Sequence, residues 1–422
     1  MKKGLRSFNP ISDRVYWESE MYGEGGVEKY ILNCIVSSGG VLGIRNVFQS
    51  KGTCQFKEWN SQTTYNRRAE GLRYENPKMT ADVGPKCIDY FLYFLPVEYF
   101  KEVILPETNL EMQNGAGGEM SWGEFVRYLG LWILMSTVGY GGDRWRYFSS
   151  EPISPWNGAP WRLGKYMTGW KFERITSSLR LTAAPRPSYC DKFHKVRSLI
   201  DGWNEHMKSC FIPGWVSCLD ESISIWTSRW TCPGFMYVLR KPHPMGNEYN
   251  FICCGVSEIM FAIELVEGKD EPKEKKKKKF HKESKTAGLL LRLCEGIFGT
   301  GKIVILDSGF CVLLALIELK KMGVYASALV KKRRYWPKFV KGDAIAQHFE
   351  DKPLGTTERL PGMLDGEKFD LFCMKDDGYV MTLMSTYGSL QVKDSQRESV
   401  RGSNGETSKF KYTEVIANHF DF

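Results

Sequence analysis

Two apolar stretches of this sequence each end on an aspartate, and they constrain the fold more than any other feature. The first is WVSCLDESISI, residues 215–225, a β-type run that stops at Asp220 and Glu221. The second is KIVILD, residues 302–307, which ends on Asp307. A carboxylate at the end of a buried strand is costly unless it faces solvent or a cation. Two such strands side by side would bring both carboxylates within range of one divalent metal ion.

The composition is that of a folded intracellular protein. Among 422 residues, 42% are hydrophobic and 14% aromatic, which argues against wholesale disorder and allows two or three domains. The net charge of +9 is consistent with a polyanionic partner. Twelve cysteines occur without a CxxC pair, as is typical of buried thiols in a reducing compartment. No hydrophobic leader follows Met1, and the longest apolar run, 129–138, is about half a membrane span, so we expect no membrane contact.

Two local features suggest a ligand site, but the sequence argues against both. Cys190/His194 and His206/Cys210 flank one predicted helix, which holds them roughly 30 Å apart and prevents them from sharing a zinc ion. The GIFGTGK segment, residues 296–302, resembles a phosphate-binding loop but lacks its Ser/Thr and precedes a strand. We interpret it as a turn.

From residue 215 onward the sequence predicts alternating strands and helices. The predicted strands are 215–220, 249–256, 260–266, 302–307 and 324–330, and the predicted helices are 286–298 and 310–322. With the helices as right-handed crossovers, these elements form a mixed sheet in the order third, second, first, fourth, fifth. In that order the first and fourth strands are neighbours, which places Asp220 beside Asp307.

The rest of the chain divides around this α/β core. Ser121 and Glu124 form a capping box that predicts a helix to about Val138. We expect five regions: a variable, partly irregular N-terminal region (1–84), a helical domain (85–210), the core (211–330), an inserted β-rich lobe with a hairpin at 369–374 and 379–385 (331–410), and the truncated start of a final core helix (411–422).

Carboxylates arranged in this way predict a Mg²⁺ or Mn²⁺ site. Mg²⁺ prefers carboxylate oxygens, and two such ions ~3.5–4 Å apart can activate an attacking oxygen and stabilise a leaving oxygen in phosphodiester displacement. Either aspartate alone is better explained as the residue that ends its strand. The pair, on strands predicted to be adjacent, favours the metal site.

Five sequence blocks resemble the piggyBac-type, IS4-like DDE transposases, from about residue 85 to the C-terminus. They are FLPVEYFKEVILPETN, LDESISIWTSRW, RKPHPMGNEYN, LDSGF and LIELKKMGVYASALVKKRRYWPK. The resemblance implies a ribonuclease H-like core with flanking helices, split by an insertion after its fifth strand. It also implies Mg²⁺-dependent cleavage and joining of DNA ends, with water and then a 3′-hydroxyl as nucleophile. Paired DNA ends imply a homodimer.

The resemblance carries two catalytic acids onto this sequence, Asp220 and Asp307. In the family, the third acid lies in a Val-Asp motif on a helix after the insertion. The matching segment, 415–422, holds only Asp421, which comes too early, so the third catalytic acid is unassigned. We therefore expect a truncated chain with impaired catalysis.

Basic residues near the predicted strand ends suggest phosphate contacts that position DNA. They are Arg240, Lys241, Lys331, Lys332, Arg333 and Arg334. Solvated loop charge explains each one alone about equally well. The lysine run 275–279 could be a nuclear localisation signal or a solvated loop, and we expect a nuclear protein.

Three functions remain open from the sequence. The first is a transposase-derived, DNA-binding protein with an incomplete catalytic core. The second is a domesticated DNA-binding or chromatin protein that performs no catalysis, and the third is a ribonuclease H-like nuclease with another substrate. Metal binding at Asp220 and Asp307 separates the first from the second.

Overall fold

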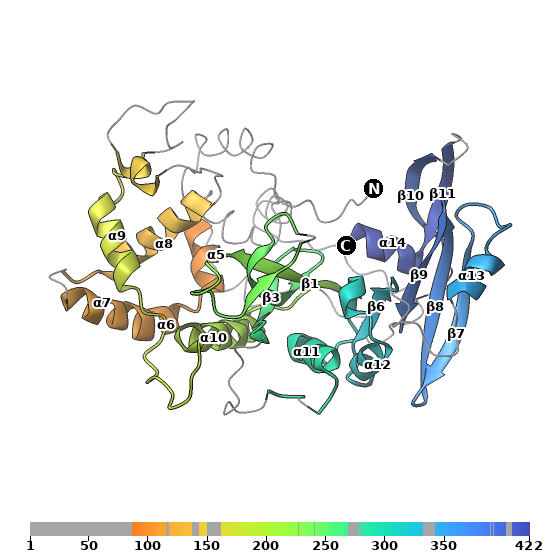
Figure 1. The fold of residues 1–422 in the computed structure, drawn as a ribbon, viewed down its shortest axis with the longest axis horizontal. Helices are drawn as coiled ribbons and strands as arrows, with labels where there is room; N and C mark the ends of the chain where they lie inside the picture. The colour runs from red at the N-terminus through yellow and green to blue at the C-terminus, as the bar shows by residue number, and fades with distance from the viewer. Residues whose placement is uncertain are drawn as a thin grey trace.

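The computed structural model describes twelve ranges of the chain. They are residues 87–114, 118–136, 143–149, 162–226, 228–239, 241–268, 278–280, 282–331, 342–388, 390, 392–401 and 407–422. The predicted N-terminal region 1–84 and the lysines 275–277 lie outside these ranges. Figure 1 shows a helical part at one end, a central sheet, and a β-rich part at the other end.

The helical part has a core of its own. Its elements are α5 (Cys87–Phe94), α6 (Val97–Tyr99), the π-helical turn η2 (Phe100–Ile104), α7 (Leu105–Gln113), α8 (Trp122–Ser136), the 3₁₀ turn η3 (Arg144–Phe148), α9 (Gly169–Ser178) and α10 (His194–Cys210). Phe125, Tyr128 and Phe172 are fully buried between them. The predicted capping box is confirmed, because the Ser121 amide donates to Glu124 and the Glu124 amide donates to the Ser121 hydroxyl.

The central sheet has the predicted strand order. Its strands are β1 (Val216–Ile225), β2 (Phe235–Tyr237), β3 (Met245–Cys254), β4 (Met260–Leu265), β5 (Ile303–Leu306) and β6 (Tyr325–Leu329). β1 pairs antiparallel with β3 and parallel with β5, β5 pairs parallel with β6, and β4 lies against β3. The order β4-β3-β1-β5-β6 is the predicted one, so β1 and β5 are neighbours.

Helices cover both faces of this sheet (Figure 1). On one face, α10, α11 (Lys285–Leu293) and α12 (Leu313–Lys321) enclose the largest core, in which Leu219, Val304 and Leu306 are buried. The short 3₁₀ turns η5 (Glu295–Ile297) and η6 (Ser308–Phe310) connect these elements. On the other face, α14 (Glu414–Asp421) packs its buried residues against Val216 and Ile303. The sheet is therefore the middle layer of three.

The first strand is longer than predicted. The sequence predicts that it ends at Asp220, but β1 continues to Ile225, since its backbone pairs with β3 as far as Ile225 opposite Gly246. Ser222 and Ser224 alternate with isoleucines there, a pattern that suits a strand with one side toward solvent. Asp220 and Glu221 thus lie within a paired strand and not at its end.

The predicted β-rich lobe continues the central sheet. The predicted hairpin is present as β8 (Glu367–Asp376) and β9 (Tyr379–Ser385), flanked by β7 (Thr357–Leu364) and preceded by α13 (Gly342–His348). β9 pairs antiparallel with β6, with Ser327 opposite Ser385, so the sheet crosses the predicted boundary at residue 330. β10 (Val392–Arg401) and β11 (Thr407–Thr413) form a separate two-stranded sheet before α14.

Three other predictions can be compared with these elements. α10 is one unbroken helix that separates Cys190/His194 from His206/Cys210, as the zinc argument requires. Residues 296–302 form a turn in which Gly299 and Gly301 have positive φ. Within the described ranges, no helix is long and apolar enough to cross a membrane.

Candidate active site

The strand register brings the two predicted acids together. Leu219 of β1 is directly opposite Leu306 of β5, and Asp220 and Asp307 are the next residues on their two chains. Neighbouring strands lie about 4.8 Å apart, and alternate residues point to the same face. Both acids therefore continue the side of the sheet that packs against α14. The sequence-based prediction that Asp220 lies beside Asp307 is confirmed.

Asp220 is the more buried acid of the pair. Its carboxylate accepts a 2.8 Å hydrogen bond from the Glu221 amide. Burial raises the pKa of Asp220 to about 6, with a further upward contribution from the charge of Glu221 and an opposing one from Lys241. The raised pKa means that burial penalises the charged form of this carboxyl, a penalty that a bound cation would offset.

Lys331 lies beside the second acid. It follows β6, the parallel neighbour of β5, and its ammonium nitrogen is 3.8 Å from a carboxylate oxygen of Asp307. Both side chains are partly exposed, at 46% and 38%. Asp220, Asp307 and Lys331 thus come from or directly follow the three adjacent parallel strands β1, β5 and β6.

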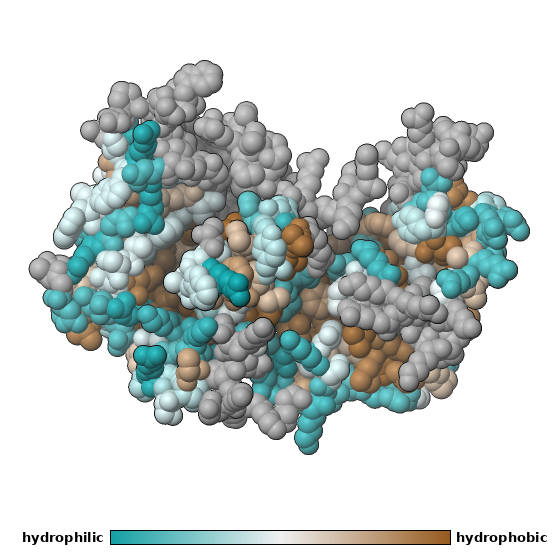
Figure 2. All heavy atoms as spheres, in the orientation of Figure 1, coloured by the Kyte–Doolittle hydropathy of each residue, from teal (hydrophilic) through white to brown (hydrophobic). Residues whose placement is uncertain are grey.

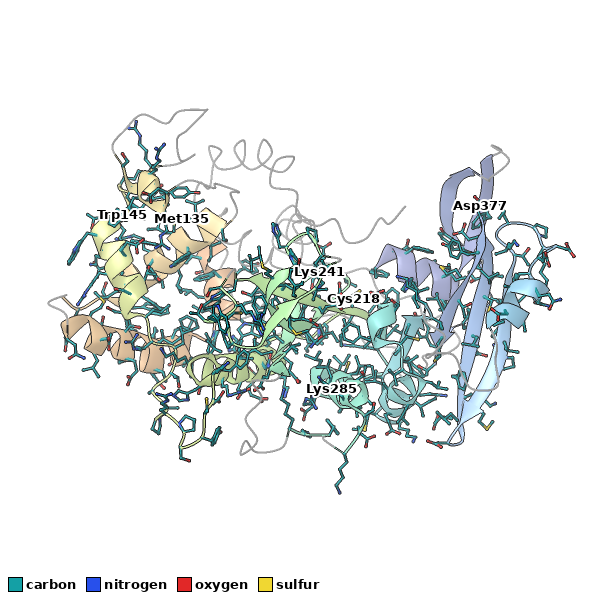
Figure 3. The ribbon with its side chains drawn as sticks, viewed as in Figure 1. Met135, Trp145, Cys218, Lys241, Lys285 and Asp377 are labelled. Atoms are coloured by element: carbon teal, nitrogen blue, oxygen red, sulfur yellow. The ribbon has the colours of Figure 1, made fainter. Side chains whose placement is uncertain are left out.

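Lys241 lies on the other side of the acid pair. Its ammonium nitrogen donates to the backbone oxygen of Glu221 at 2.7 Å and is 3.5 Å from the Glu221 carboxylate. Figure 3 labels Lys241 near Cys218, which precedes Asp220 on β1. Of the six predicted DNA-binding residues, the structure therefore places two at the site. The other four, Arg240, Lys332, Arg333 and Arg334, lie outside the described residues.

The final helix, α14, covers one face of the candidate site. The Cys218 thiol donates to the backbone oxygen of Phe422 at 3.3 Å, and the Phe422 ring packs edge-to-face on Trp215. His419 projects from this helix near Asp307 and Lys331, and burial lowers its pKa to about 4. A helix is thus present in the predicted segment 411–422, and it lies against the acid-bearing face.

Sequence reasoning missed three residues around this site. Glu221 was treated only as the end of a strand, yet its side chain is 9% exposed and pairs with Lys241. His419 and the buried Glu414 lie on α14, and the charge of Glu414 acts on Tyr387. The only sequence signal for Glu414 and His419 is the helical periodicity of residues 414–421. It does not place them at the site, because the residues around them belong to β9 and the central sheet.

Comparison with known proteins places the chain in a family. A family model described as Transposase IS4 matches residues 86–419. The chain belongs to the Transposase IS4 family. Among solved structures, a piggyBac transposase determined by cryo-electron microscopy in a synaptic complex with hairpin DNA is similar, with a TM-score of 0.57 and 16% identity. The match covers 78% of this chain and 66% of that chain. No curated protein matches the sequence.

The structural likeness bears on the fold of this Transposase IS4 family chain. At 16% identity it shows that the chain has the ribonuclease H-like architecture of the piggyBac transposase. The predicted fold class is therefore confirmed. The chain spans about two thirds of the length of that relative.

The candidate site of this Transposase IS4 family chain provides some of the ligands that a hard divalent cation requires. Asp220 and Asp307 provide carboxylate oxygens from adjacent strands, which is the ligand type that Mg²⁺ and Mn²⁺ prefer. Across the parts of the chain that the structure describes, no group of three or more His, Cys, Asp or Glu side chains could hold a metal ion. The third catalytic acid therefore stays unassigned.

Proposed function

We propose that this chain is a DDE-type transposase-derived protein that binds DNA and holds Mg²⁺ or Mn²⁺ at Asp220 and Asp307. The observation that carries the proposal is the register of Leu219 opposite Leu306, which aligns the two acids on one face. Membership of the Transposase IS4 family supports cleavage and joining of DNA ends as the reaction class. The synaptic complex of the piggyBac relative supports DNA as the partner.

The described residues would divide the work at a DNA phosphate. Lys331 and Lys241 flank the acids and would neutralise the approaching backbone, which fixes its position without reading its sequence. Asp220 and Asp307 would hold the cation, which polarises a phosphoryl oxygen when bound. Asp220 would bind the cation in its ionised form, so a proton would compete with the cation below the pKa of about 6.

A DNA-binding or chromatin protein without catalysis is the second candidate. It is favoured by the observation that, among the described residues, no group of three or more His, Cys, Asp or Glu side chains could hold a metal ion. The same basic residues would serve it, and Asp220→Asn would leave its DNA affinity unchanged. A nuclear location and a homodimer that pairs two DNA ends are further parts of the proposal, and they rest on family membership.

Cleavage of labelled DNA tests the first candidate. The full chain is incubated with Mn²⁺ and a duplex that carries candidate element ends, and products are resolved on denaturing gels. The proposal predicts nicking that Asp220→Asn and Asp307→Asn abolish. DNA binding with no cleavage favours the second candidate, and equal cleavage of unrelated duplexes and RNA–DNA hybrids favours a ribonuclease H-like nuclease. Absence of DNA binding contradicts the first two candidates.

A further inference from the structure

The tip of strands β1, β2 and β3 carries exposed apolar surface that the acid pair does not use. We call this set of six side chains the aromatic tip, and Trp230 is its most exposed member at 89%. Its members are Ile225, Trp226, Trp230, Tyr237, Leu239 and Met245. Figure 2 shows hydrophobic side chains reaching the surface near the middle of the molecule, among hydrophilic ones. Gathered apolar surface of this kind typically marks a binding site.

The loop that presents Trp230 is held by buried anchors. Cys232 is 3% exposed, and Gly234 has a φ of +59°, with its missing Cβ position 2.6 Å from the backbone oxygen of Val266. The Trp226 indole donates to the Thr231 hydroxyl at 3.0 Å across the loop. Trp230 therefore stays exposed on a fixed support, which lowers the entropy lost when a ligand covers it.

The strands place several members of the aromatic tip in one row. Tyr237 of β2 is directly opposite Met245 of β3, and the Trp226 amide donates to the Met245 oxygen at 3.2 Å. Residues opposite one another across strands have neighbouring side chains on the same face. The three side chains thus form an apolar strip across the end of the sheet.

The charge around the aromatic tip selects a polyanion. Residues 222–247 contain no Asp or Glu, although the whole chain has 49 acidic residues. The described residues of the same segment include Arg229, Lys241 and His243. The Arg229 guanidinium lies 5.6 Å from the Trp230 ring centroid. A segment that combines aromatic side chains with cations and contains no acidic residue fits unpaired nucleobases and their phosphates.

The strand connects the aromatic tip to the acid pair over a short distance. Ile225 is five residues beyond Asp220 on β1, which corresponds to about 17 Å at the usual rise of a strand. A strand of duplex DNA advances about 3.4 Å per nucleotide, so this distance corresponds to at most about five nucleotides. Lys241 bridges the interval through its bond to Glu221.

We propose that the aromatic tip binds unpaired nucleotides of a DNA strand whose phosphate lies at Asp220 and Asp307, with Trp230 stacked on a base. This inference rests on the proposed function, since it needs DNA at the acid pair. It adds a positioning role for Trp230, at the tip of the strand that carries Asp220.

Binding of two matched DNA molecules by the full chain tests this inference. One is a blunt fluorescent duplex and the other is the same duplex with a single-stranded overhang of about ten nucleotides. Affinities from fluorescence anisotropy are compared for wild type, Trp230→Ala, Trp230→Phe and Trp170→Ala. Trp170 is a matched control because it is 65% exposed on α9, in the helical part. Thermal melting verifies that each variant is folded.

The inference predicts a selective loss. Trp230→Ala should weaken binding of the overhang DNA about tenfold, the effect of one lost base stack. Trp230→Phe should retain most of that affinity, and every variant should bind the blunt duplex like wild type. If wild type binds DNA and Trp230→Ala binds the overhang equally well, the inference is wrong while the proposed function stands. A Trp230→Ala change in sedimentation without a change in DNA affinity would identify a protein interface instead. If wild type binds neither DNA, the proposed function fails as well.

Discussion

Asp220 and Asp307 occupy equivalent positions on two neighbouring parallel strands, each directly after the opposed pair Leu219 and Leu306. Both acids lie on the face that α14 covers, where Val216 and its neighbours are fully buried. Burial penalises the charged form of Asp220 and raises its pKa to about 6. The relationship therefore has consequences for stability as well as for ligand binding.

Asp220→Asn should make the protein more stable at neutral pH. Burial raises the pKa of Asp220 from 3.8 to about 6, so between these values the native state keeps a proton that the unfolded chain has lost. The stability from this carboxyl is present below the unfolded pKa and disappears as the pH rises through about 6. We expect a gain of roughly 2–3 kcal/mol at neutral pH and little change near pH 4.

Urea unfolding at both pH values measures this effect. Asp377→Asn is the control, because Asp377 lies on the turn between β8 and β9, away from the acid pair (Figure 3). Equal gains at both pH values, or a gain in the control, would contradict the assignment of the effect to Asp220.

Lys331→Gln should weaken DNA binding with little dependence on sequence. A phosphate contact releases counterions, so its loss should reduce the slope of log affinity against log salt by about 0.9. Binding isotherms over a series of salt concentrations measure this slope. Lys321→Gln is the control, because Lys321 is the last residue of α12, at the other end of the parallel strands, and pairs with Glu318. An unchanged slope for Lys331→Gln, or an equal reduction in the control, would argue against a phosphate contact.

The order of the core strands could be predicted from sequence because each element carries a local signal. Ile303–Leu306 is apolar throughout, as a strand buried on both faces requires, and the crossover rule then leaves one arrangement. The extension of β1 to Ile225 was missed, although the alternation of Ser222 and Ser224 with isoleucines is a strand pattern, because the strand was expected to end at Asp220. The pairing of β9 with β6 was missed because strand partners distant in sequence leave no local pattern.

Only the residues of the candidate site that lie on or directly after the parallel strands could be predicted from the sequence. Asp220 and Asp307 follow from the strands that carry them, and Lys331 follows from the end of β6. His419 could not be found, because its position beside Asp307 depends on how α14 packs across the sheet. The pairing of Lys241 with Glu221 likewise depends on the turn between β2 and β3.

Arg197→Met should be strongly destabilising. Arg197 contacts Asp191 and Glu267 at 2.5 Å each, and these two carboxylates are only 2% and 3% exposed. Removing the cation leaves two buried charges in one place, which typically costs about 3–5 kcal/mol. Urea unfolding measures the change. Lys208→Met is the control, because its main partner Glu205 is exposed and such pairs contribute about 1 kcal/mol or less. Similar losses for the two variants would contradict this account.

Gly246→Ala should disturb the strands that carry the aromatic tip. Gly246 has a φ of +155°, and a Cβ there would lie 2.0 Å from the backbone oxygen of Ser224 on β1. The two strands must separate locally, so we expect a loss of more than about 1 kcal/mol in thermal or urea unfolding. Gly123→Ala in α8 is the opposite case, since no atom lies within 4 Å of its Cβ position. That change should stabilise by up to about 1 kcal/mol, and a loss there would contradict the packing argument.

Calorimetric titration with Mn²⁺ tests the metal site most directly. The full chain is compared with Asp220→Asn and Asp307→Asn at neutral pH, with Asp377→Asn as the matched control. We predict that wild type and the control bind Mn²⁺ and that each of the other two variants loses at least about tenfold in affinity, because metal sites tolerate the loss of a direct ligand poorly. If neither Asp220→Asn nor Asp307→Asn alters the titration, the two acids do not form a metal site.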